Sequence, residues 1–346
     1  MTYSGAPRHG VNGFLVQDTG AADHLALSLN ENPFPPLPGV RTAIVESIGA
    51  VNPHPECLPD QLRRLIADRI GVSQRQVVLG AGATGVILSV LQRLTTPGDR
   101  IALATPTFDG YSIVTRITRL TPLTVPLDNH GRNDLAALAD AVAHAQAVVI
   151  CRPHNPTGTV DSPVALKEFL QRIPADKTVI LDEAYVEFVA PQDRIDTVEL
   201  VRRFPNVVVV RTFSKAYGLA GLRIGYGFGS PELAATLWPI QQPFGMDITT
   251  LAAVSASYRA EPQLRRRIGI LLAEQQSLRS QLRAMGVEST DARANFVYLP
   301  GPGRQWRELF EDSGIQVRHY PDGGVRITVG TRSSTRAVIA AVQHEL

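Results

Sequence analysis

Short apolar segments alternate with longer amphipathic ones between residues 77 and 228, and this alternation restricts the fold more than any other feature. It is typical of an α/β protein in which helices cover a mainly parallel sheet. The expected strands are Val77–Leu79, Arg100–Ala104, Thr121–Pro126, Ala147–Cys151, Thr178–Leu181, Val207–Arg211 and Ile224–Phe228. The expected helices are Thr84–Leu94, Asp109–Arg119, Leu135–Ala143 and Val164–Arg172. Functional groups should then gather where strands end and lead into helices.

The pattern changes after about Pro243, where a long arginine-rich helix over Glu261–Met285 precedes two strands, residues 295–299 and 325–329. A length of 346 residues is also more than one compact core usually holds. We therefore expect a large domain, residues 41–243, and a smaller α/β C-terminal domain, residues 244–346. Residues 1–40 are rich in glycine and proline and predict an arm that packs on the small domain or on a partner subunit.

The composition, 44% hydrophobic and 19% charged residues, is that of a globular protein. No apolar run approaches the roughly 20 residues that span a bilayer, and the first residues lack the order of a secretory signal. We therefore expect a cytoplasmic protein without membrane contact. A net charge of +2 is too small to indicate a nucleic-acid partner. Cys57 and Cys151 lie far apart without metal-ligand spacing, so no metal is expected.

Lysine is rare, since only three of the 34 Lys and Arg residues are lysines. A lysine amine, unlike a guanidinium, can condense with an aldehyde to form a Schiff base. Lys167 lies in a pattern typical of a surface helix, and Lys177 directly precedes an apolar strand. Lys215 lies instead among small residues and hydroxyls in the segment 212–226, with an arginine following. Taken alone, it could equally be a lysine in a glycine-rich surface loop.

Four further segments carry polar groups at predicted strand ends. The glycine-rich turn at residues 80–85 opens a helix and could hold a phosphate on its backbone N–H groups, although such glycines often serve only the turn. The segments 155–158 and 181–185 place Asn155 and Asp182 after neighbouring strands, where a turn and a helix N-cap are the simpler interpretations. Ser214 and Arg223 suit an anion, or ordinary surface hydrogen bonds.

Taken together, these segments resemble fold type I pyridoxal-phosphate enzymes of the class I/II aminotransferase superfamily. The most telling pieces are Leu29-Asn30-Glu31-Asn32-Pro33-Phe34, the segment from Thr212 to Arg223, Ala294-Asn295-Phe296-Val297 and Val325-Arg326-Ile327-Thr328-Val329-Gly330-Thr331. Within the superfamily the chain is most similar to histidinol-phosphate aminotransferases and aromatic amino acid aminotransferases. The resemblance implies a three-layer, mainly parallel sheet, pyridoxal 5'-phosphate as cofactor, a role in amino acid biosynthesis, and a homodimer with shared active sites.

The resemblance also implies a role for each matching residue. Lys215 would hold the cofactor and then move a proton, and Asp182 would keep the ring nitrogen protonated. Asn155 and Tyr185 would bind the ring hydroxyl oxygen, and Phe108 would stack on the ring. The residues implied for the phosphate are Ala83, Thr84, Thr212, Ser214 and Arg223. Those implied for the substrate are Asn32 and Arg326.

Several segments depart from the family pattern, and two of them concern residues expected near the cofactor. Pro53-His54-Pro55-Glu56 has a histidine where the family has the tyrosine that reaches the neighbouring subunit's cofactor phosphate, so His54 would take that place. Cys151-Arg152-Pro153-His154 adds two basic side chains near the expected ring position. Both changes concern recognition more than cofactor chemistry.

Several functions fit these residues. The favoured one is transamination of histidinol phosphate or an aromatic amino acid, with glutamate and 2-oxoglutarate as the other pair. The same residues would serve a decarboxylase of a phosphorylated amino acid, as in threonine-phosphate decarboxylases, or an aminotransferase of a specialised pathway. A noncatalytic, ligand-sensing role would require an additional DNA-binding domain, for which the sequence leaves no residues.

Overall fold

The computed structural model describes residues 25–303 and 305–345, and its centre is a seven-stranded sheet with the order β1-β7-β6-β5-β4-β2-β3. Six of these strands run in the same direction, and β7 runs in the opposite direction. The strands are β1 (Val77–Ala81), β2 (Arg100–Thr105), β3 (Thr121–Pro126), β4 (Ala147–Cys151), β5 (Thr178–Asp182), β6 (Val207–Thr212) and β7 (Ile224–Phe228). Each of the seven predicted strands is present, with its ends within two residues of the prediction.

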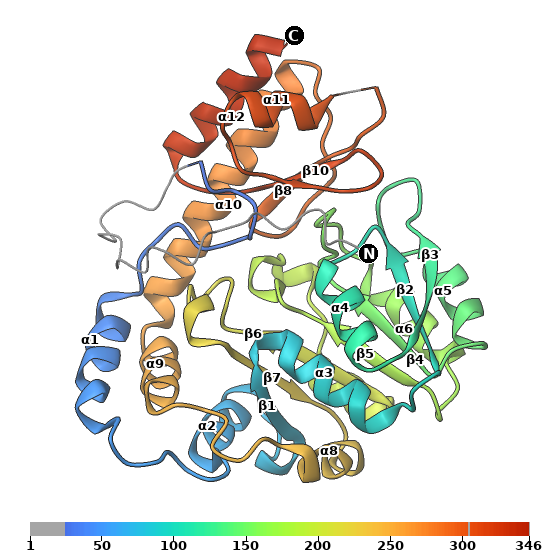
Figure 1. The fold of residues 1–346 in the computed structure, drawn as a ribbon, viewed down its shortest axis with the longest axis vertical. Coiled ribbons are helices and arrows are strands. Elements are labelled where there is room, and N and C mark those ends of the chain that lie inside the picture. Colours follow the sequence, from blue (N-terminus) through green and yellow to red (C-terminus); the bar gives the residue numbers. More distant parts are fainter. Residues whose placement is uncertain (1–24, 304, 346) are drawn as a thin grey trace.

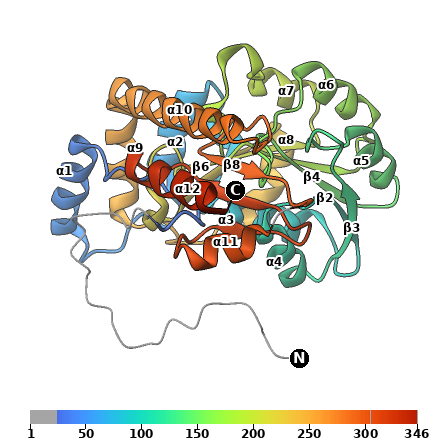
Figure 2. The same ribbon diagram turned by 90° about the horizontal axis from the view of Figure 1, so that it is seen from above.

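Helices cover both faces of this sheet and make three layers (Figures 1 and 2). Successive side chains of a strand point to opposite faces, and β6 shows this clearly. Val207 and Val209 pack with helices on one face, while Val208 and Val210 pack with helices on the other. The first face carries α2 (Asp60–Ile70), α5 (Leu135–Val142), α6 (Pro163–Arg172), α7 (Thr197–Arg203) and α9 (Ile248–Arg259). The second carries α3 (Gly82–Leu94), α4 (Asp109–Ile117) and α8 (Pro231–Leu237).

A smaller antiparallel sheet with the order β8-β10-β9 forms the second unit, above the large sheet in Figure 1. Its strands are β8 (Phe296–Leu299), β9 (Arg318–His319) and β10 (Val325–Thr328). Its helices are α10 (Glu261–Ala284), α11 (Trp306–Asp312) and α12 (Arg332–Glu345). Because these elements share a separate buried core, the expected smaller α/β unit is present.

The domain limits stay a prediction, and the packing favours a boundary inside α10 rather than at residue 244. Val254 of α9 and Leu264 of α10 belong to the core under the large sheet. Leu271 and Leu278, further along α10, belong to the core of the small sheet. The helix therefore links the two units.

Residues 1–24 of the predicted arm lie outside the described residues, and the rest of the arm divides in two. Leu27 donates a backbone hydrogen bond to Gln316 and accepts one from Thr328, so this part lies along the small sheet. Helix α1 (Pro38–Ser47) instead packs against α9. Within the described part of the chain, no helix combines the length and the apolar character needed to cross a bilayer.

Candidate active site

The carboxyl ends of β4, β5 and β6 meet at one edge of the large sheet and carry the central side chains. Cys151, the last residue of β4, lies beside Asp182 in register, and Asp182 lies beside Val210. The chain after β4 reaches Asn155 and the chain after β6 reaches Lys215. Because neighbouring parallel strands end at one edge, the topology delivers these residues to either side of Asp182.

Asp182 is buried, with only 4% of its surface exposed. Oδ2 accepts a 2.6 Å hydrogen bond from the phenol of Tyr111, and Oδ1 accepts one of 3.0 Å from the amide of Ala184. Burial raises the pKa of Asp182, and the hydrogen bond from Tyr111 opposes that shift. Sequence reasoning missed Tyr111, because an aromatic residue in an amphipathic helix is normally a core residue.

Lys215 lies on a partly buried loop, where Nζ donates a 2.9 Å hydrogen bond to the carbonyl oxygen of Leu29. Desolvation lowers the pKa of Lys215 to about 8, and the positive charge of Arg326 acts in the same direction. The charges of Glu31 and Asp182 oppose the shift. The amine is therefore neutral in part near physiological pH.

Asn32 lies against the lysine loop. Its amide nitrogen donates to the carbonyl oxygens of Lys215 at 3.3 Å and Ala216 at 3.0 Å, and its oxygen accepts from the amide of Phe34. All these partners are backbone groups, so Asn32 helps to fix the position of Lys215. Its expected role in substrate binding stays a prediction.

A buried hydrogen-bonded chain joins the two sheets across the site. The guanidinium of Arg326 donates to Asn155 at 2.6 Å and to the phenol of Tyr320 at 3.1 Å. Asn155 donates to the phenol of Tyr185 at 3.3 Å, and so does Asn30 at 2.9 Å. Neither Asn30 nor Tyr320 was predicted as a site residue, although Asn30 lies in the segment 29–34 that contributes to the family resemblance.

The start of α3 and the loop after β6 form a second polar group. The hydroxyl of Ser214 accepts from Thr212 at 3.0 Å and from Arg223 at 3.4 Å. Ala83 and Thr84 lie in the first turn of α3, where backbone N–H groups lack helical partners. Gly225 of β7 has no side chain that could collide with this turn, whereas a Cβ there would overlap the backbone of Gly82.

Two predicted cofactor residues differ in their surroundings. Phe108 is partly buried at the start of α4 and meets Tyr111 edge to face, at 5.4 Å between ring centroids. His54 is exposed on the segment between α1 and α2, with its ring 5.3 Å from that of Phe244. His54 therefore lies outside the buried group around Asp182.

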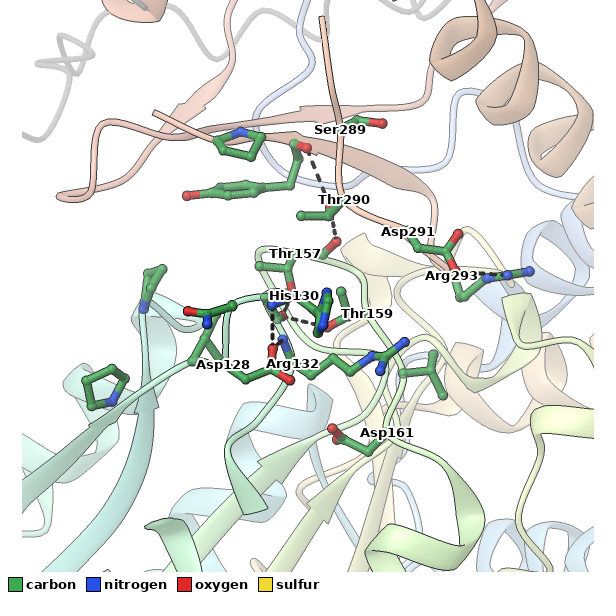
Figure 3. Close-up of a pocket in the computed structure, with 18 of the residues that line it drawn as sticks. Asp128, His130, Arg132, Thr157, Thr159, Asp161, Ser289, Thr290, Asp291 and Arg293 are labelled. Carbon is green, nitrogen blue, oxygen red and sulfur yellow. Dashed lines mark hydrogen bonds and ion pairs between the residues drawn. The ribbon is translucent and has the colours of Figure 1, made fainter. Parts of the chain in front are cut away.

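A cavity of about 830 Å3 opens beside the site, between the loops after β2, β3 and β4 and the segment 288–300 (Figure 3). Arg152 lies behind it, fully buried, and donates to the backbone oxygens of Asp161 and Asp193. His154 contacts the carbonyl oxygen of Pro106, and burial lowers the pKa of His154 to about 4. The basic side chains of this segment thus serve the loop structure, and His154 is neutral.

The lowered pKa of Lys215 can be tested in the ligand-free protein. A lowered pKa means that the neutral, reactive amine forms at lower pH than for an ordinary lysine, near 10.4. We expect brief acetylation at pH 6.5 to 10.5, followed by peptide mass spectrometry, to give a midpoint near pH 8 for Lys215. Exposed Lys167 provides the reference in the same sample. Equal midpoints for both lysines would contradict the shift.

Known proteins are similar to this chain in sequence. The family model for aminotransferase class I and II matches residues 22–342. An aromatic amino acid aminotransferase of Streptomyces avermitilis is 40% identical over 307 residues, covering 88% of this chain and 86% of that protein. Another, from Streptomyces coelicolor, is 40% identical over 322 residues, covering 92% and 89%.

Solved structures give the same fold. A histidinol-phosphate aminotransferase from Sinorhizobium meliloti in complex with pyridoxal-5'-phosphate has a TM-score of 0.85 and 26% identity, covering 93% of this chain and 91% of that one. An L-threonine-O-3-phosphate decarboxylase from Porphyromonas gingivalis has a TM-score of 0.76 at 22% identity, covering 88% and 94%, a likeness of fold alone. With a family match over nearly its whole length, this chain belongs to the class I and II aminotransferases.

Proposed function

We propose that this chain transfers the amino group of an aromatic amino acid to a 2-oxo acid such as 2-oxoglutarate, with pyridoxal 5'-phosphate as cofactor. Family membership makes an amino acid and a 2-oxo acid the two substrates. The aromatic donor is supported by two relatives that are 40% identical over about nine-tenths of the chain. The observation that carries the chemistry is the partly neutral Lys215 amine, which lies within the electrostatic reach of both Asp182 of the large sheet and Arg326 of the small sheet.

The residues around Asp182 suit the ring end of this cofactor. Bound pyridoxal phosphate supplies an aldehyde and a ring that accepts electrons from the substrate α-carbon when its nitrogen is protonated. Lys215 offers a nucleophilic amine, and once released it can take up or return a proton at Nζ. The Asp182 carboxylate keeps free lone pairs for a ring N–H. Asn155 and Tyr185 would bind the ring oxygen, and Phe108 would cover the ring face.

The second polar group suits the phosphate end. Thr212 and Ser214 offer hydroxyls, Arg223 offers a guanidinium, and the free N–H groups of Ala83 and Thr84 point out of the positive end of α3. Hydroxyls, a guanidinium and a helix N-terminus are the donors that phosphate prefers. The site thus offers a carboxylate at one end and an anion cradle at the other.

Arg326 would bind the carboxylate of the substrate. A guanidinium fork matches a carboxylate in two parallel hydrogen bonds, and Asn155 and Tyr320 hold this fork from the large and small sheets. A phosphate matches the same fork. Histidinol phosphate is therefore the second candidate donor, supported by the likeness to the Sinorhizobium meliloti enzyme.

The homodimer is also part of this proposal. Val45, Ile48 and Val51, on α1 and the turn after it, are each more than half exposed. Phe244, whose ring lies beside that of His54, is 50% exposed. Exposed apolar groups of this kind are typical of a protein interface. His54 would reach the partner's cofactor phosphate.

The dimer is tested by its mass in solution. We expect light scattering to give a molar mass of about twice 37.5 kDa, and the double variant Val45→Asp with Ile48→Asp to have half that mass. A monomeric mass for the unmodified protein would contradict the dimer.

Donor preference is tested by product analysis. With bound cofactor and 2-oxoglutarate, we expect glutamate to form from phenylalanine and from tyrosine. The value of kcat/KM for these donors should be at least about tenfold above that for histidinol phosphate. A tenfold ratio corresponds to a difference of about 1.4 kcal/mol in transition-state binding. Lys215→Ala should lower the rate roughly 1,000-fold or more, because the amine acts as nucleophile and proton carrier. Carbon dioxide from threonine phosphate without glutamate would instead establish the decarboxylase.

The role of Arg326 is tested by Arg326→Lys, which keeps the charge but removes the fork. We expect kcat/KM for the amino acid to fall about ten- to a hundredfold, mainly through KM, while the dissociation constant of the cofactor stays within about threefold. Arg172→Lys, at an exposed ion pair with Asp140, is the matched control. An unchanged KM for Arg326→Lys would place the substrate carboxylate elsewhere.

A further inference from the structure

Tyr111 is a buried side chain at the site to which the proposed function gives no part. It is 2% exposed, and its Oη donates to Oδ2 of Asp182 at 2.6 Å. A short hydrogen bond to an ionised acceptor is stronger than one between neutral groups. The hydrogen bond therefore directly affects whether the Asp182 carboxyl group is ionised.

The carboxylate needs such a partner because it is buried. Removing a charged group from water is costly unless hydrogen bonds or opposite charges compensate. Among the residues that the structure describes, the other direct donor to Asp182 is the Ala184 amide. Of the charged groups around it, Lys215 favours the ionised form and Glu183 opposes it. The Cys151 thiol, from β4, stays uncharged because burial raises its pKa. Tyr111 is the strongest of the groups that counter the desolvation of Asp182.

Packing also fixes the direction of the phenol. Tyr111 lies in the core on the second face of the large sheet, together with Val114 of the same helix. The ring of Phe108 meets it edge to face, and a side chain at Gly110 would overlap the ring of Phe108. Burial also raises the pKa of Tyr111, so the phenol remains a neutral donor. Its Oη is thus held toward Asp182.

We propose that Tyr111 is a positioning residue that holds the Asp182 carboxylate in its charged form and aims it at the cofactor ring. The inference rests on the proposed function, in which Asp182 binds the ring nitrogen. Tyr111 acts through Asp182 and contacts neither substrate nor cofactor itself.

A double-mutant cycle tests this on the full-length, cofactor-loaded protein. Tyr111→Phe keeps the ring and its packing but removes the hydrogen bond. We expect kcat to fall about ten- to a hundredfold, as for the loss of one hydrogen bond to a charged group, with KM nearly unchanged. In an Asp182→Asn background the same change should have little further effect, because residues that act through one another are not additive.

A second readout does not depend on turnover. The Tyr111 hydrogen bond stabilises the ionised carboxylate, so its removal should raise the pKa of Asp182. The pH below which pyridoxal phosphate binds more weakly should therefore move upward by about one unit, the size of shift that a change of roughly 1.4 kcal/mol gives. Fluorescence titration of the cofactor from pH 4.5 to 9 measures this.

Tyr298→Phe is the matched control, because its phenol donates to Oδ2 of Asp322 at the same 2.6 Å. It should leave the pH dependence unchanged. Two results for Tyr111→Phe would overturn the inference: an unshifted binding profile with normal kcat, or a full additional loss in the Asp182→Asn background. Wild-type activity of Asp182→Asn would instead overturn the role of Asp182 in the proposed function. Thermal unfolding of each variant verifies that the fold is retained.

Discussion

A carboxylate buried at the carboxyl edge of a parallel sheet is the constraint on which this site depends. Water cannot reach Asp182 freely, so protein groups have to supply its hydrogen bonds. Tyr111 and the amide of Ala184 do so. The strand register then sets Asn155 and Lys215 on either side, because the chains leaving β4 and β6 start beside Asp182.

The large sheet alone does not complete the site. Leu29 and Asn30, from the segment before α1, reach Lys215 and Tyr185, and Arg326 comes from the small sheet. The charge of Arg326 also contributes to the lowered pKa of the lysine. The reactivity of Lys215 therefore depends on how the two sheets meet, and a change at their junction should alter its chemistry without touching the lysine itself.

Prediction from sequence succeeded where burial leaves a strong pattern. Strands buried on both faces read as continuous apolar runs, so β4, β5 and β6 were found almost to the residue. Helices α1 and α9 were not predicted, because their apolar residues recur with only weak helical periodicity. The two helices pack against each other, and the sequence does not show that contact. Tyr111 was missed for a related reason, since an aromatic residue in an amphipathic helix normally belongs to the core. Tyr320 lies in a polar loop sequence, where nothing pointed to a role at the site.

The sequence by itself determined the sheet, the family and the position of Lys215, because these depend on local apolar pattern and on one rare residue type in a glycine-rich segment. Only the tertiary structure decided which groups surround the buried carboxylate, that Asn32 supports the lysine loop, and that His154 is neutral. Hydrogen-bond partners and desolvation arise between residues far apart in the chain, and no spacing along the sequence encodes them.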